Sequence, residues 1–302
     1  MSFENLIGNY NVKEELKEAI KNNKIVHSYM FVGQEGIGKK KYALEFAKKL
    51  LCLSNNKDTC NNTCESCIKF NSNNHPDFFY VEPEGNSLKI SQVRTLQESI
   101  YQKPIISNKK IYIINDANKM TVEAQNAFLK TLEEPPEYAV IILIVSNENM
   151  LLNTIKSRCL RVYFNSIEQQ EFLQYIKKNN IIENPSDSII EMCGGSFSRL
   201  ENIKENYDKY SSIEEIFTDF INKKEKSIIN IFNKFDVLYK KEDIQNLLEY
   251  MIVIIYNLIK TEGYKKRYIS AINIIENCRK KISSNCNFDM CIDELLLKLY
   301  EI

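Results

Sequence analysis

The sequence predicts an α/β protein with a parallel sheet, a phosphate-binding loop and an all-helical C-terminal part. Three observations support this expectation. Short apolar runs alternate with amphipathic helical segments up to about residue 164, as in a parallel sheet covered by helices. A glycine-rich stretch at residues 33–40 lies between an apolar run and a helical segment. From about residue 167 onward, the apolar residues recur only at helical spacing.

The elements of the first half can be placed from apolar runs and breaker residues. Val140 to Val145 is continuously apolar, which is typical of a parallel strand buried on both faces. Strands are expected at residues 29–32, 78–81, 110–114, 140–145 and 161–164. Helices are expected at residues 9–22, at 41–51, from a Ser91 cap to Gln102, and from a Thr121 cap to the stop at Pro135.

In the second half, Phe172, Tyr175 and Ile176 mark one helix, and residues 189–192 mark another. Ser198 to Glu201 has the form of a capping box that would begin a third helix. From about residue 206 we expect helix to the end of the chain, interrupted only at Gly263.

The composition gives no sign of general attraction to nucleic acid or membranes. Forty basic residues balance forty acidic ones, so any DNA contact needs a local patch or an assembly. Residues 1–4 lack a basic start and an apolar core, so no secretory signal is expected. The longest apolar segment, residues 251–259, is about half the roughly 20 residues of a membrane helix. We expect a cytoplasmic protein without membrane contact.

Residues 33–40 have the pattern of a phosphate-binding loop up to its last position. The glycines at 33, 36 and 38 allow backbone N–H groups to turn toward phosphate oxygens, and Lys39 follows them. The last position normally carries Ser or Thr, whose hydroxyl holds Mg²⁺, and this chain has Lys40.

The strand end at residues 115–116 also departs from that of an ATPase. Asn115 carries no charge for a metal ion, and Asp116 replaces a glutamate that is longer by one methylene. Displacing a catalytic group by about 1 Å can cost about 100-fold in rate. Together with Lys40 these residues argue against hydrolysis, so ATP and Mg²⁺ are doubtful ligands. Two alternatives stay open: an ordinary tight turn, or a cradle that binds phosphate without turnover, with the Lys40 ammonium near the usual metal position.

Four cysteines cluster in the polar segment 52–76. Cys52, Cys60, Cys64 and Cys67 form a C-x7-C-x3-C-x2-C pattern, and four thiolates suit a structural tetrahedral Zn²⁺ ion. With four cysteines available, His75 is not expected to be a ligand. The alternative is four unlinked thiols.

The sequence resembles the delta-prime family of bacterial DNA polymerase III clamp-loader subunits, in the AAA+ superfamily. The resemblance covers residues 1 to about 200 and rests on the cysteine cluster and several motifs. These motifs are Ile25–Gly33, Asn74–Asp77, Ile90–Arg94, Asp116–Thr121, Ala124–Pro136, Ser157–Cys159 and Gly194–Ser196. The motor subunits of the same assembly, tau and gamma, share many of these motifs but keep Lys-Thr or Lys-Ser in the loop and Asp-Glu on the strand.

The resemblance implies three domains and several site residues. A RecA-like AAA+ domain would span residues 1–164 with a zinc module inserted at 52–76, followed by a helical lid at 165–205 and a helical collar domain at 206–302. Arg158 would act as an arginine finger in a neighbouring subunit's ATP site. Ser146 and Asn147 would occupy the first-sensor position. Arg199 would occupy the second-sensor position, or simply lie on a helix surface.

The implied function is that of an accessory subunit that helps to load the sliding clamp onto primed DNA. Its partners would be delta and tau or gamma, with primer-template DNA contacted inside the assembly and the clamp contacted only indirectly. One alternative is an active ATP-hydrolysing motor subunit of the same loader. Another is a free nucleic-acid-binding zinc protein.

Overall fold

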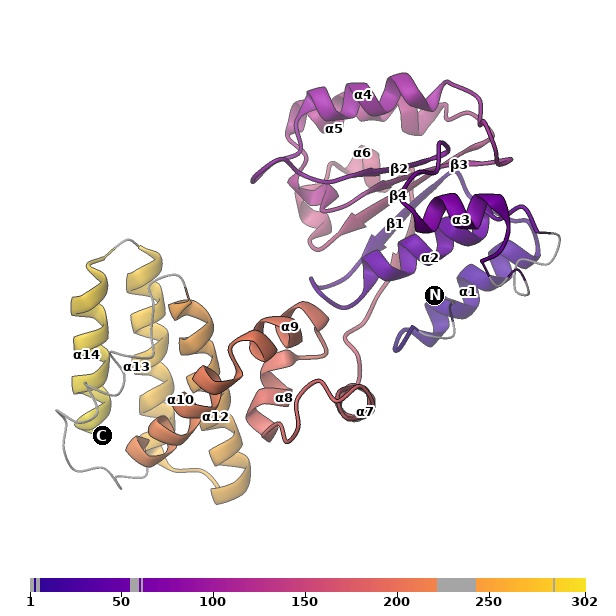
Figure 1. Ribbon diagram of the computed structural model, residues 1–302. Coiled ribbons are helices and arrows are strands. Elements are labelled where there is room, and N and C mark those ends of the chain that lie inside the picture. Colours follow the sequence, from indigo (N-terminus) through magenta and orange to yellow (C-terminus); the bar gives the residue numbers. More distant parts are fainter. Residues whose placement is uncertain (1–2, 4–5, 55–59, 61, 222–242, 285) are drawn as a thin grey trace. The chain divides into compact units, whose positions relative to one another are not determined.

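The structure is a computed structural model that describes residues 3, 6–54, 60, 62–221, 243–284 and 286–302. The chain divides into two compact units, Met1–Glu171 and Phe172–Ile302. The predicted three-domain division remains a prediction, since the helices assigned to a lid and to a collar fall largely into one unit. We describe each unit by itself (Figure 1).

The first unit contains a five-stranded parallel sheet in the order β2-β3-β4-β1-β5. Its strands are β1 (Ser28–Val32), β2 (Phe78–Val81), β3 (Lys110–Ile114), β4 (Ala139–Val145) and β5 (Leu160–Tyr163). Every predicted strand is confirmed, with ends that differ by at most one residue. β4 is buried along its whole length, as its unbroken apolar run predicted.

Helices cover both faces of this sheet (Figure 1). One hydrophobic core lies beneath α1 and α2, and a second lies beneath α4, α5 and α6. The helices of this unit are α1 (Tyr10–Lys21), α2 (Lys39–Leu51), α3 (Glu65–Asn71), α4 (Ile90–Ile100), α5 (Val122–Glu133) and α6 (Asn153–Lys156), with short 3-10 turns η2 (Ala117–Lys119) and η3 (Glu148–Met150).

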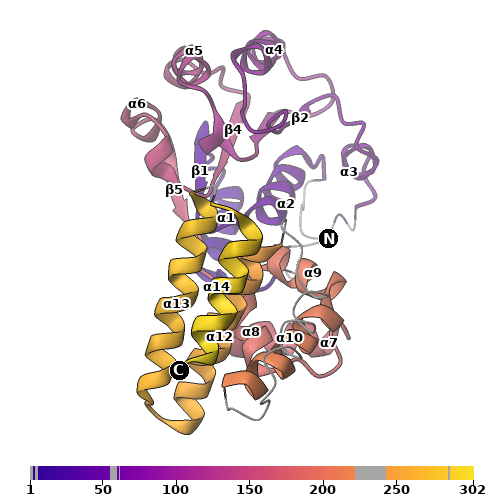
Figure 2. The ribbon, with the colours of Figure 1, turned by 90° about the vertical axis from the view of Figure 1, so that its left-hand side faces the viewer.

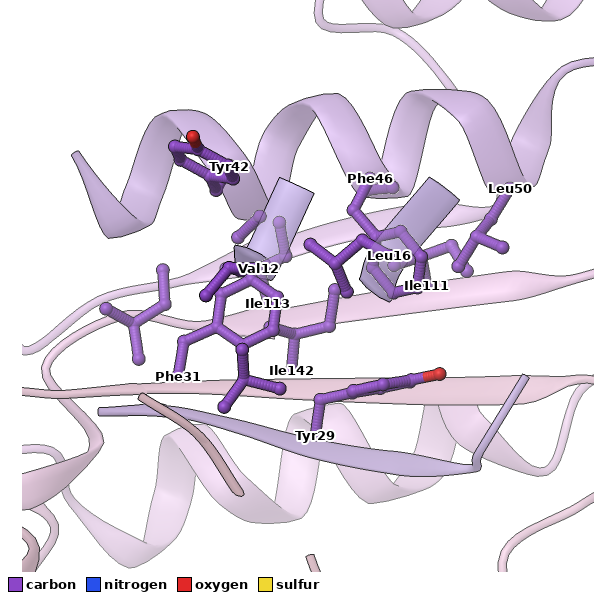
Figure 3. Packing of buried hydrophobic residues seen from close by; sticks show 14 of the residues in the cluster. Val12, Leu16, Tyr29, Phe31, Tyr42, Phe46, Leu50, Ile111, Ile113 and Ile142 are labelled. Atoms are coloured by element: carbon purple, nitrogen blue, oxygen red, sulfur yellow. The ribbon is translucent and has the colours of Figure 1, made fainter. Parts of the chain in front are cut away.

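Aromatic side chains fix α2 on the sheet. Figure 3 shows Phe46 and Leu50 pointing from α2 toward the side chains of the strands, and Tyr42 belongs to the same buried cluster. The rings of Phe46 and Tyr29 meet edge to face with centroids 5.2 Å apart, a favourable arrangement for aromatic pairs. The loop that begins α2 is therefore attached to a rigid helix.

The predicted start of α4 was wrong by two residues. Lys89 is the N-cap residue, and its backbone N–H donates to the Gln92 side chain at 3.1 Å, so Ser91 lies inside the helix. Leu88, just before the cap, exchanges backbone hydrogen bonds with residues around Met120. This pairing with a segment some thirty residues away sets the helix start. The helix also ends at Ile100 rather than Gln102. Thr121, by contrast, caps α5 as predicted, because its hydroxyl accepts a hydrogen bond from the Ala124 N–H.

The second unit is helical in the described residues. Figure 2 shows α12, α13 and α14 running side by side. Its helices are α7 (Gln169–Lys178, which straddles the boundary), α8 (Asp187–Cys193), α9 (Phe197–Glu205), α10 (Tyr207–Ile221), α12 (Ile244–Glu262), α13 (Lys266–Ser283) and α14 (Phe288–Tyr300). None of the helices in the described part of the chain is long and apolar enough to cross a membrane.

Two expectations for this unit need correction. Ser196, not Ser198, caps α9, because the Ser196 hydroxyl accepts from the Arg199 N–H after the glycine pair ends α8. Gly263 does end α12, with φ of 82°, but it is not the only break. A second break precedes α14, where the Asn287 side chain accepts from the Met290 N–H. The predicted helix at residues 222–242 lies outside the described residues.

Candidate functional site

The glycine loop connects β1 to α2 with a backbone that needs its glycines. Gly36 and Gly38 have φ of 80° and 97°, which disfavours other residues. A Cβ atom at Gly33 would lie 2.6 Å from the Phe164 carbonyl oxygen. Gly38 is the N-cap of α2, so the loop presents backbone N–H groups at a helix N-terminus. The geometry of a phosphate cradle is present.

Lys39 bonds back to the backbone of its own loop. Its Nζ donates hydrogen bonds to the carbonyl oxygens of Gly33 and Gln34, each at 2.5 Å. The residue is only 6% exposed. Burial lowers the pKa of Lys39 to about 8, and the carboxylates of Asp116 and Glu35 oppose this shift. The loop is thus closed by contacts with its own lysine.

Lys40, in the position of the usual Ser or Thr, extends toward β2. Its Nζ lies 4.5 Å from the centroid of the Tyr80 ring, within the range of a cation–π interaction. Burial raises the pKa of the Tyr80 hydroxyl. Tyr80 was not predicted as a site residue, because an aromatic residue on a predicted strand is the only signal that the sequence carries for it.

Asn115 and Asp116 follow β3 directly. The Asn115 N–H continues the sheet by donating to Val81 O at 2.8 Å. Asp116 has φ of 47°, and its carboxylate forms an ion pair with Lys119 at 3.0 Å. The carboxylate in the position of the water-orienting glutamate is therefore already paired within its own turn.

Ser146 and Asn147 follow β4, so they lie at the carboxyl ends of the parallel strands, as do the loop and residues 115–116. The Ser146 backbone N–H and hydroxyl both donate to the Asn118 side-chain oxygen, at 3.0 and 3.1 Å. The Asn147 side chain accepts from the Asn149 N–H and caps η3. Sequence reasoning missed Asn118, which lies two residues beyond Asp116.

Arg158 lies at the opposite end of the parallel strands, where they begin. It precedes β5, whereas the glycine loop follows β1, and these two strands are parallel neighbours. Four strand residues at about 3.3 Å each, roughly 13 Å, separate the two ends of β5. The structure therefore does not bring Arg158 together with the chain's own loop.

The Arg158 guanidinium is partly exposed and is held by hydrogen bonds. Its two terminal nitrogens donate to Thr154 O at 2.8 Å and to Glu133 Oε1 at 2.7 Å, and the side chain is 32% exposed. Cys159, the next residue, is buried, and burial raises the pKa of its thiol to about 12. The side chain of Cys159 is thus packed in the core as a neutral thiol, directly beside the accessible Arg158.

Arg199 lies in the second unit, in the first turn of α9. Its guanidinium donates to Met192 O at 3.2 Å and pairs with Glu249 of α12 at 3.0 Å. Glu249 also lies 3.8 Å from Arg279 of α13. In this structure Arg199 links three helices of its own unit.

The four predicted cysteines form one cluster. Their sulfur atoms all lie within 4.8 Å of one another, with Cys52 and Cys64 3.8 Å apart and Cys60 and Cys67 3.9 Å apart. A tetrahedral Zn²⁺ with bonds of about 2.3 Å requires sulfur atoms about 3.8 Å apart. The donor set and spacing therefore fit such an ion.

The surroundings of the cluster lower the pKa of two of its thiols, Cys60 and Cys64. A hydrogen bond from the Cys64 backbone N–H lowers the pKa of Cys60 to about 6. Burial raises the pKa of Cys52 and Cys67, so a metal would displace protons from these two thiols.

A buried polar network joins this cysteine cluster to the sheet. His75 lies outside the cluster: its Nδ1 accepts from the Asp77 N–H, and its Nε2 lies 2.9 Å from the Ser66 hydroxyl. The Asp77 carboxylate accepts three backbone N–H groups, from residues 105, 106 and 107, at 2.6 to 2.8 Å. Sequence reasoning gave Asp77 no structural role.

Comparison with known proteins agrees with this architecture. A family model described as "DNA polymerase III, delta subunit" matches residues 8–168. The DNA polymerase III subunit delta' of Bacillus subtilis is 27% identical over 96% of this chain and 95% of its own length. The subunit gamma/tau of Mycoplasma pneumoniae is 30% identical over 70% of this chain, but only 31% of that longer protein is covered.

A solved structure shares the fold. The Thermotoga maritima DNA polymerase III gamma subunit-related protein aligns with 95% of this chain and 98% of its own, with a TM-score of 0.58 and 20% identity. The family model covers more than half of the chain, and a delta' subunit aligns with nearly all of it. The chain therefore belongs to the family of DNA polymerase III delta-prime subunits.

Proposed function

We propose that this chain is an accessory subunit of a clamp loader that supplies Arg158 to the ATP site of a neighbouring subunit. It would assemble with tau or gamma and with delta, and help to load the sliding clamp onto primer-template DNA held inside the assembly. The observation that carries this proposal is the position of Arg158, partly exposed at the end of the parallel strands opposite to the chain's own loop. An arginine there is available to another subunit and not to its own loop.

The contacts at the chain's own loop support the absence of hydrolysis there. Lys39 donates to the loop carbonyls, Lys40 lies over Tyr80, and Asp116 is paired with Lys119. The groups that would hold phosphate, Mg²⁺ and water in an ATPase are each replaced or engaged elsewhere.

We also propose a structural Zn²⁺ ion held by the four cysteines. The ion would join the C-terminal end of α2 to α3, since Cys52 is the C-cap of α2 and Cys64 the N-cap of α3. Structural zinc in small modules contributes on the order of 10 kcal/mol of binding free energy at neutral pH.

The competing proposal is an active motor subunit. The intact glycine geometry of the loop and the similarity to a gamma/tau subunit favour it. Steady-state ATPase of the isolated chain separates the two proposals. Robust ATP turnover by the isolated chain, abolished by Lys39→Ala, would show that the chain is an active motor subunit. That result would overturn the proposal of an accessory subunit.

The main test is reconstitution with tau or gamma and delta subunits, using Arg158→Ala. An arginine finger given in trans contributes about 10³- to 10⁵-fold at its site. We expect intact assembly, loss of turnover at the one site that Arg158 completes, and reduced clamp loading. Arg161→Ala is the matched control, because Arg161 is exposed on β5 and lies 3.9 Å from its acidic partner Glu148. Unchanged turnover with Arg158→Ala would refute the proposed role.

A further inference from the structure

Arg158 is held from two sides by groups of different elements. One terminal nitrogen donates to Thr154 O, one turn earlier in its own segment, at 2.8 Å. The other donates to the carboxylate of Glu133, the last residue of α5, at 2.7 Å. A weaker contact of 3.4 Å joins the first nitrogen to the Ser157 hydroxyl. A long, flexible side chain at the surface is thereby confined to one direction.

Glu133 is well placed to act as an anchor because the end of α5 is fixed. The Gln97 amide of α4 donates to Ala127 O and to the Thr131 hydroxyl, both at 2.8 Å. Thr131 and Leu132 are buried against the core. Pro135 follows closely and prevents the helix from continuing. The carboxylate therefore projects from a rigid support.

We propose that Glu133 is a positioning residue that orients the Arg158 guanidinium toward a phosphate bound by an adjoining subunit. This inference rests on the proposed function of Arg158. Arginine has five N–H donors, and the three contacts described above leave two of them for a ligand. The anchored guanidinium can therefore bind a phosphate while it keeps its hydrogen bond to Glu133.

The charge of Glu133 also permits the opposite effect. A carboxylate beside a guanidinium can compete with a phosphate for the same donors, in which case its removal would raise turnover. The geometry favours positioning, because Glu133 takes only one N–H donor of the guanidinium and two others are left for a phosphate.

The test uses the reconstituted assembly with Glu133→Ala, Glu133→Gln and the matched control Glu134→Ala. Among the described residues, the structure records no ion pair for the exposed Glu134 side chain. Exposed ion pairs contribute little, so we expect Glu133→Ala to lower kcat by only about two- to fivefold. KM for ATP should not change, because the contact orients a group that acts in the transition state. Glu133→Gln keeps an acceptor oxygen and should lie between the wild type and Glu133→Ala.

The double variant Glu133→Ala/Arg158→Ala separates this inference from the function on which it rests. If Glu133 acts through Arg158, its substitution has no further effect once Arg158 is absent. Three results would overturn the inference while the role of Arg158 stands. Glu133→Ala could lower kcat equally with and without Arg158, could leave the kcat of the otherwise wild-type assembly unchanged, or could raise turnover. If Arg158→Ala itself has no effect, the proposed function fails first.

Discussion

At the scale of single residues, the fold changes the titration of Lys39. In the unfolded chain its pKa is near 10.5, whereas burial lowers the pKa to about 8 in the folded protein. Between these two values the unfolded chain binds more protons than the folded protein does. The contribution of Lys39 to the free energy of unfolding therefore rises as pH increases from 8 toward 10.5.

We predict that Lys39→Met removes this rise. The difference in free energy of unfolding between wild type and variant should grow in favour of the wild type between pH 8 and 10, as measured by urea denaturation. Lys24→Met, at an exposed site of the same unit, serves as the control and should show a constant difference. A difference between wild type and Lys39→Met that stays constant from pH 8 to 10 would mean that the lysine is solvated in the folded protein.

Asp77 stabilises the fold through hydrogen bonds to backbone groups. In Asp77→Asn an amide N–H₂ would face at least one of the three backbone N–H donors. Hydrogen bonds to charged groups contribute about 1.5–3 kcal/mol, so we predict a loss of roughly that size in the free energy of unfolding. Chemical denaturation measures it, with Glu84→Gln on an exposed turn as control. A loss below the error of the method would contradict this account.

At the scale of elements, the cysteine cluster joins the end of α2 to the start of α3. A tetrahedral Co²⁺ complex should form on titration of the metal-free protein and be visible by its absorption. Cys64→Ser should abolish that spectrum, and Cys278→Ser, a buried cysteine far along the sequence in α13, should leave it intact. Retention of the tetrahedral spectrum in Cys64→Ser would refute the four-cysteine site.

The same cluster predicts a count of released protons. With a pKa of about 6, the Cys60 thiol is already ionised at neutral pH, and the pKa of Cys64 is also lowered. Cys52 and Cys67 have raised pKa values and still carry protons. Zinc binding at pH 7 should therefore release fewer than four protons, as measured by titration in weak buffer. A release of four would show that all the thiols are protonated before binding.

The sequence predicted the elements better than their contacts. Apolar runs placed every strand within one residue, and the signal is strongest for β1, β3 and β4, which are buried along their whole length. The starts of α2, α4 and α9 were each misplaced by two residues. At α4, pairing of Leu88 near Met120 decides the start, and the sequence pattern does not show that pairing. The contacts of Arg158 with Glu133 and of Ser146 with Asn118 likewise join residues about 25 or more apart.

For the molecule as a whole, the division after Glu171 predicts a first unit that folds alone. Glu171 accepts hydrogen bonds from the Gly8 N–H at 2.9 Å and from the Tyr10 hydroxyl at 2.5 Å, so it fastens the start of α1. We predict that residues 1–171 unfold cooperatively on heating, and that Glu171→Ala in this segment lowers stability by about 1–3 kcal/mol. Non-cooperative unfolding of the wild-type segment would show that it depends on the second unit.

The strand order has a consequence for synthesis on the ribosome. β1 is fully buried, yet its register pairs Ser28 with Ile141 and Tyr29 with Leu160, so both its neighbours are made more than a hundred residues later. At about 5–20 residues per second, the apolar segment Ser28–Val32 waits roughly 5 to 20 seconds for β4. The proposed metal site at residues 52–67 would need only a short loop and could form soon after these cysteines emerge. Slowed translation between codons 32 and 139 should therefore increase aggregation, or dependence on chaperones, more than the same delay placed after codon 171.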